Sequence, residues 1–122
     1  MKPNETKINA ILDAIGQDIE THENLIETAF ATLEKMNISD EEYKAANRQL
    51  GLSAYIAGYL RNLIELTVAK EPLKTIENRM RFHAHSQRTK GELDDGQEIS
   101  EAQKIVAVLL EGYVQKFFET TE

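Results

Sequence analysis

Apolar residues recur at alternating steps of four and three along the first third of the chain. The stripe consists of Ile8, Leu12, Ile15, Ile19, His22, Ile26, Ala29, Leu33 and Met36. Steps that average 3.5 residues keep these side chains on one side of an α-helix, so the stripe must pack against a partner surface along its length. The pattern predicts a helix from Asn4 or Thr6 to about Met36, closed by Asn37.

A second helix is predicted from Ser39 to Lys70. Ser39 and Glu42 have the spacing of a capping box, which marks the start of a helix. The later half of the segment is apolar on more than one side, as expected for a helix that is central in the fold or covered by another subunit. Gly51 leaves two alternatives open, because a glycine either divides a helix or is tolerated within it at a cost of about 1 kcal/mol.

Two shorter helices are predicted in the rest of the chain. Pro72 forces a boundary and suits the first turn of a helix that runs to Lys90 and is terminated by Gly91. Residues 91–98 contain two glycines and four acidic residues, which is typical of a solvated loop. Ser100 and Gln103 form a second capping box, so the fourth helix is expected to span about 101–119.

These elements predict an all-α fold, with residues 1–122 forming a single helical-bundle domain. We expect an antiparallel four-helix bundle with a long N-terminal helical hairpin. At 1.5 Å per residue the first two helices reach about 48 Å each and the other two about 30 Å, so the short pair cannot cover the long one. Unless the second helix folds over itself at Gly51, the hairpin tip should form a homodimer through Leu33, Tyr43 and Leu50.

Composition narrows the class of partner. The net charge of −7 disfavours a general attraction to nucleic acid or anionic lipid. The chain has no cysteine, which excludes disulfides and thiolate metal sites, and no apolar run approaches the roughly 18 residues of a membrane span. We therefore expect an acidic cytoplasmic protein that does not associate with membranes.

The segment from residue 72 to 91 is the exception to this acidity, with five basic residues and one acidic residue. Arginine and lysine side chains on one helix suit an acidic protein surface, and tyrosines are common anchors of interfaces. The predicted partner-binding residues are Arg79, Arg81, His85, Arg88 and Lys90, with Tyr55 and Tyr59. The sequence thus favours a non-catalytic, cofactor-free protein-binding module, such as an adaptor, an inhibitor or immunity-type protein, or an accessory subunit.

Two nucleic-acid alternatives remain open. The basic helix 72–90 could contact phosphates, and residues 46–56 have the glycine and serine of a helix-turn-helix turn. Separately, Arg79 and His85 resemble the Arg-x4–6-His motif of HEPN ribonucleases, a likeness that implies a small dimeric helical bundle that cleaves RNA with these two residues. Met80 stands where that family has a polar residue, and six steps of 100° place Arg79 and His85 nearly on opposite sides of a helix.

Two histidines occupy apolar stripes. His22 and His83 lie on separate predicted helices, and inward histidines of a bundle can hydrogen-bond in the core, sense pH or bind a metal. The sequence lacks the local histidine and glutamate pairs that bundle metal sites use. We therefore expect no metal at these positions, and structural and pH-sensing roles both remain open.

Overall fold

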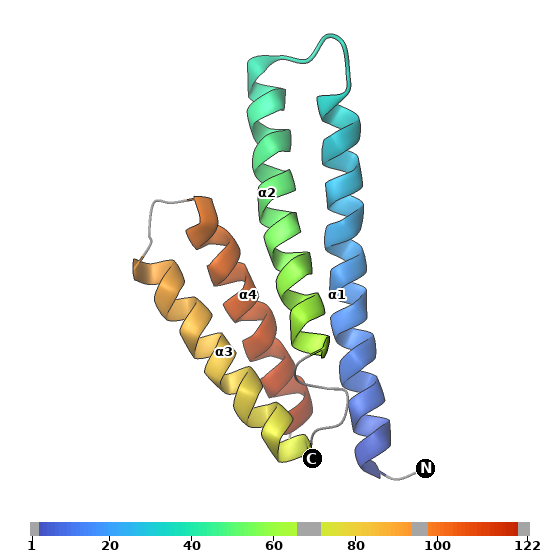
Figure 1. Cartoon of the computed structure of the whole chain (residues 1–122), viewed down its shortest axis with the longest axis vertical. Coiled ribbons are helices and arrows are strands. Elements are labelled where there is room, and N and C mark those ends of the chain that lie inside the picture. The colour runs from blue at the N-terminus through green and yellow to red at the C-terminus, as the bar shows by residue number, and fades with distance from the viewer. Residues whose placement is uncertain (1–2, 66–71, 94–97, 120–122) are drawn as a thin grey trace.

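The computed structural model of the chain describes residues 3–65, 72–93 and 98–119 (Figure 1). The elements are α1 (Pro3–Leu33), α2 (Asp40–Leu63), α3 (Leu73–Leu93), α4 (Glu98–Val114) and the π-helical segment η2 (Gln115–Glu119). The described residues contain no strand, so the predicted all-α fold is confirmed. None of the helices in these ranges has both the length and the apolar character needed to cross a membrane.

The helices pack as two neighbouring pairs. α1 lies beside α2 and α3 lies beside α4, and the two pairs meet chiefly where α2 contacts α4 (Figure 1). One cluster of buried apolar residues draws on all four helices: Ile11, Ile15 and Ile19; Ile56, Leu60 and Leu63; Ile76, Met80 and Ala84; and Ala102, Val106, Leu110, Tyr113 and Val114. A bundle around a shared core follows from this packing.

Polar side chains join helices across this core. The Tyr55 and Tyr59 hydroxyls of α2 reach Gln87 and His83 of α3, at 2.9 and 2.7 Å. The Tyr113 hydroxyl of α4 donates a hydrogen bond to a carboxylate oxygen of Asp18 in α1. Each bond satisfies polar groups that would otherwise be costly to take out of water.

The predicted start of α2 is confirmed by its N-cap. The Ser39 hydroxyl accepts a hydrogen bond from the Glu42 backbone N–H at 3.1 Å. α2 then continues through Gly51 without interruption, so the alternatives that break the helix there, including the helix-turn-helix turn, are wrong. A single glycine costs little beside the packing of the residues around it. The predicted end near Lys70 falls outside the described residues.

The predicted α3–α4 boundary is wrong at two positions. α3 continues through Gly91 to Leu93, and Gly91 is buried where α3 crosses α4. A Cβ atom there would lie 2.7 Å from Lys104 Cγ and 3.1 Å from the Ser100 carbonyl oxygen, so glycine permits close approach of two helices instead of ending one. α4 begins at Glu98, which places Ser100 inside the helix and rules out its role as an N-cap.

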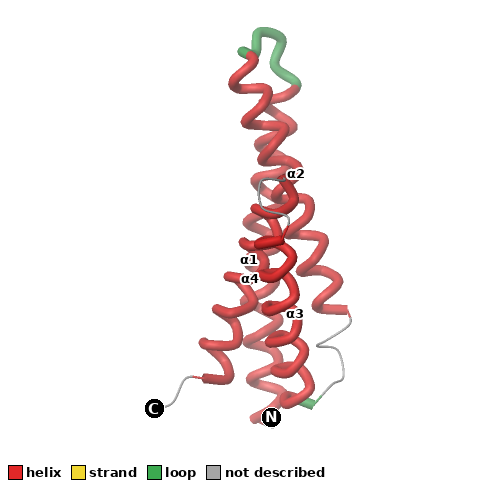
Figure 2. The backbone as a smooth tube through the Cα atoms, turned by 90° about the vertical axis from the view of Figure 1, so that its left-hand side faces the viewer, coloured by secondary structure: helices red, strands yellow, loops and turns green. Residues whose placement is uncertain are grey.

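α1 ends three residues earlier than predicted, at Leu33, and residues 34–39 lead into α2. At this end α1 and α2 extend beyond α3 and α4, as Figures 1 and 2 both show. At the base of this end an ion pair joins Arg48 of α2 to Glu101 in the first turn of α4. We call residues 25–50, which include this projecting end, the tip.

Candidate functional site

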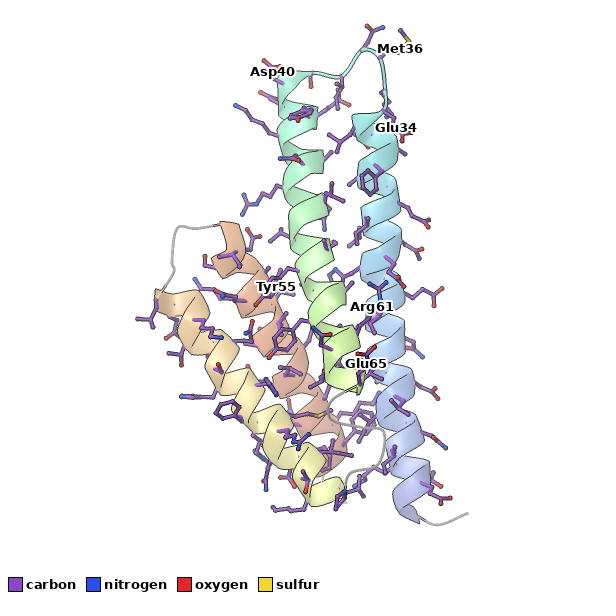
Figure 3. The ribbon with its side chains drawn as sticks, in the orientation of Figure 1. Glu34, Met36, Asp40, Tyr55, Arg61 and Glu65 are labelled. Carbon is purple, nitrogen blue, oxygen red and sulfur yellow. The ribbon has the colours of Figure 1, made fainter. Side chains whose placement is uncertain are left out.

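The tip contains few large buried side chains. Its buried residues are Ala29 of α1 and Ala46 of α2, both with small side chains, whereas leucines of the tip such as Leu33 and Leu50 are only partly buried. Three of the seven most exposed large apolar side chains in the described ranges belong to the tip, namely Phe30, Met36 and Tyr43. Figure 3 shows Met36 at the far end, beyond the reach of α3 and α4.

One side of the tip bears a shallow, mostly apolar groove of about 290 Å³. It is lined by Leu25, Thr28, Ala29 and Thr32 of α1 and by Glu42, Ala45, Ala46 and Gln49 of α2. Leu25 and Thr32 follow Asp18 at seven-residue intervals, and Asp18 contacts Tyr113 of α4. Because residues seven apart lie on nearly the same side of a helix, the groove continues the side of α1 that contacts α4.

The other side of the tip carries the exposed aromatic residues. Tyr43 and Phe30 are 52% and 50% exposed. Glu23 of α1 and Arg61 of α2 form an ion pair between the two helices. Phe30 lies seven residues after Glu23 on α1, and Tyr43 lies five helical turns before Arg61 on α2. Both aromatic rings therefore lie on the side of the pair marked by the Glu23–Arg61 contact.

The three predicted self-association residues all belong to the tip. Tyr43 is half exposed, and Leu33 and Leu50 are partly buried. Leu50 follows Tyr43 by seven residues and so shares its side of α2. We call Phe30, Leu33, Tyr43 and Leu50 the tip face; sequence reasoning missed Phe30, which lies outside the apolar stripe of α1.

A polar chain lies at the base of the tip. The Gln49 side-chain amide donates a hydrogen bond to the Ser53 hydroxyl at 2.6 Å, and that hydroxyl lies 3.3 Å from His22 Nδ1. Burial lowers the pKa of His22, and the nearby Asp18 carboxylate opposes this effect. The lowered pKa favours neutral imidazole, whose Nδ1 can accept a hydrogen bond from the Ser53 hydroxyl. Sequence reasoning missed Ser53, although it is a polar residue in an otherwise apolar stretch.

The predicted partner-binding arginines of α3 bind carboxylates of their own chain. Arg88 Nε donates to Glu111 at 2.8 Å, and Arg81 binds both Glu77 and Glu119, each at 2.9 Å. The bond from Arg81 lowers the pKa of Glu77, and that from Arg88 lowers the pKa of Glu111. These pairs neutralise much of the positive charge of α3.

A groove of about 500 Å³ runs between α3 and the end of α4. His85, Arg81 and Arg88 line it from α3, opposite Glu111 and Glu119. Arg79 does not line this groove, so the structure does not bring together the two residues of the HEPN-like motif there. Lys90 lies exposed near the end of α3.

Tyr55 and Tyr59 point from α2 toward α3 and α4, as Figure 3 shows for Tyr55. Both rings are partly buried against the core and stack with their centroids 6.2 Å apart. Burial raises the pKa of Tyr59 to about 12, and burial lowers the pKa of His83, with Arg79 and Lys90 adding to that effect. Both tyrosines thus anchor α2 to α3, through His83 and the buried Gln87.

The two candidate histidines belong to separate polar networks, because His22 contacts Ser53 whereas His83 contacts Tyr59. Within residues 3–65, 72–93 and 98–119, no group of three or more histidine, aspartate or glutamate side chains is arranged to hold a metal ion.

Comparison of the chain with protein-family models, curated proteins and solved structures gives no match.

Proposed function

We propose that this protein is a non-catalytic protein-interaction module that forms a homodimer through the tip face. The observation that carries the proposal is the exposure of Phe30 and Tyr43 on a part of the molecule that α3 and α4 leave uncovered. Aromatic rings bury a large apolar area when they enter an interface, and they are enriched at the centre of interfaces. A second copy would cover these rings on both molecules at once.

The proposal rests on an antiparallel, up-and-down bundle with a long N-terminal hairpin. Support comes from the short connection between α1 and α2 and from the side-by-side packing of successive helices. A two-helix face about 20 Å wide and 20 Å long offers roughly 400 Å² per copy, at the small end of known interfaces. We therefore expect a dimer that dissociates on dilution. The cytoplasmic location expected from the cysteine-free sequence is part of the same proposal.

A further protein partner is proposed to bind α3. The side chains of Lys90 and Arg79 are exposed on this helix and give it a basic surface that suits an acidic partner. The nucleic-acid and HEPN-like alternatives have less support. The carboxylates around Arg81 and Arg88 compete with phosphate, and Arg79 is not part of the groove that His85 lines.

Sedimentation equilibrium over a dilution series tests the dimer. The unaltered protein should move from dimer toward monomer on dilution, and Phe30→Ser combined with Tyr43→Ser should shift this transition to higher concentration by at least about tenfold. The matched control is Phe82→Ser, which removes an exposed ring from α3 outside the tip. A monomer at all concentrations, or equal effects of both changes, would overturn the proposal.

A further inference from the structure

The outer side of α3 bears two large apolar side chains. α3 lies at the edge of the bundle, beside α4 (Figure 1). Its residues Met80 and Ala84 are buried in the core, whereas Phe82 and Leu93 are 67% and 80% exposed. Phe82 and Leu93 are eleven residues, or about three helical turns, apart. They therefore form one row, the apolar row, on the side of α3 that faces away from the core.

Arg79 and Lys90 form a second row, the basic row, beside the apolar row. Both are exposed, and each precedes a residue of the apolar row by three positions. Their positive charges reach the same neighbour, since the pKa of His83 is lowered by burial and further by Arg79 and Lys90. Residues 78–91 include no aspartate or glutamate. No carboxylate of this stretch therefore interrupts the two rows.

The exposed ring of Phe82 is positioned by its neighbours. It packs edge-on against the His83 ring, with the two centroids 5.7 Å apart and the ring planes at 78°. His83 Nδ1 in turn lies 2.7 Å from the Tyr59 hydroxyl of α2. Because these contacts restrict the ring before a partner arrives, covering it costs less side-chain entropy than covering a freely rotating group. Phe82 is thus suited to be the central anchor of an interface.

We infer that this side of α3 binds an acidic amphipathic helix of a partner protein through both rows. A helix that lies along α3 returns to the same side after eleven residues, about 16 Å, which is the spacing within each row. Two apolar side chains of the partner would cover Phe82 and Leu93, and two carboxylates would lie against Arg79 and Lys90. The inference deepens the proposed binding of a protein partner to α3 and rests on it.

The limited width of this surface favours a single helix as its occupant. The adjoining side of α3 carries Arg81 and Arg88, which are bound to Glu119 and Glu111. A membrane or a nucleic acid is wider than one helix and would face these carboxylates and the net charge of −7. A helix along α3 meets the basic row without facing them.

Fluorescence anisotropy with a synthetic helical peptide tests the inference. The probe is an alanine-rich peptide with two leucines eleven residues apart and two glutamates eleven residues apart, each glutamate three positions from a leucine. It should bind the unaltered protein. Phe82→Ser should weaken binding by about tenfold and Lys90→Glu by about fivefold. The matched controls, Val108→Ser on α4 and Lys44→Glu on α2, change exposed residues elsewhere and should leave binding unchanged.

Two altered peptides separate the apolar row from the basic row. Replacing the glutamates of the peptide by glutamine should weaken binding by about fivefold, and replacing its leucines by glutamine by about tenfold. If the peptide without leucines binds as well as the original, charge alone directs binding. That result overturns the inference but leaves a protein partner of α3 in place. If none of the peptides binds, the inference and that part of the proposed function both fail.

Two other occupants of the surface give distinct results. Binding to phosphatidylserine vesicles that is tighter than binding to the peptide, and is lost in Lys90→Glu, would assign the surface to a membrane. Self-association of Phe30→Ser/Tyr43→Ser that is abolished by Phe82→Ser would assign it to a second copy. Either result overturns the inference, whereas the tip dimer is tested independently by sedimentation of the unaltered protein.

Discussion

α1 and α2 pass through two regions that differ in what surrounds them. Where all four helices meet, these two helices bury isoleucine and leucine side chains such as Ile15 and Leu60. In the tip they bury only Ala29 and Ala46, and leucines at equivalent positions, such as Leu33, stay partly exposed. The apolar stripe of the sequence is continuous through both regions. Its burial therefore depends on α3 and α4, which lie along the core region and extend no further than the base of the tip (Figure 2).

The largest expected difference between the regions is in packing energy. Leu60→Ala removes a fully buried side chain from the four-helix core and should lower the free energy of unfolding by about 3 kcal/mol. Leu33→Ala in the tip removes a partly exposed side chain and should cost about 1 kcal/mol or less. Urea denaturation at a concentration that keeps both variants monomeric measures the two losses. Equal losses would mean that the tip is packed as well as the core.

The next effect distinguishes two glycines. Gly91→Ala places a methyl group against Lys104 and the Ser100 carbonyl and should destabilise the fold by about 1–2 kcal/mol, because two helix backbones must move apart. Gly51→Ala meets no atom within 4 Å and should stabilise by about 0.5–1 kcal/mol through helix propensity. Thermal unfolding followed by circular dichroism compares them. A stabilising Gly91→Ala would contradict the close crossing of α3 and α4.

The smallest effect concerns pH. His22 and His83 have lowered pKa values in the folded state, so the unfolded chain binds more protons as the pH falls below its ordinary histidine pKa of 6.5. The free energy of unfolding should decline from pH 7 to pH 5, by less than about 1 kcal/mol because both rings are partly solvated. The lowered pKa values of the Glu77 and Glu111 carboxyl groups affect the free energy of unfolding only below about pH 4.5.

Replacement of both histidines tests this linkage. The double variant His22→Gln/His83→Gln should show a flatter profile of unfolding free energy between pH 7 and pH 5, with His85→Gln on the exposed side of α3 as the control. Chemical denaturation at three pH values is sufficient. A profile as steep as that of the unaltered protein would assign the pH dependence to other groups.

Helix positions followed from the sequence where periodicity and capping agreed, as at Ser39. The predicted helix boundaries at Gly91 and Ser100 were wrong. A glycine packed against a neighbouring helix looks the same in the sequence as one that ends a helix, and a serine inside a helix looks the same as an N-cap. The exposure of Tyr43 was expected from helix lengths. The bonds from Arg81 to Glu119 and from Arg88 to Glu111 were not expected, since they depend on how α3 and the end of α4 align. Tertiary contacts of this kind leave no mark in a single sequence.

Hydrogen–deuterium exchange at two protein concentrations tests the tip dimer most directly, because it reports which residues are covered. Raising the protein concentration through the dimer transition should slow amide exchange in residues 25–50. In Phe30→Ser/Tyr43→Ser this change should be absent at the same concentrations. Exchange in the tip that is identical at low and high concentration in the unaltered protein would contradict the account.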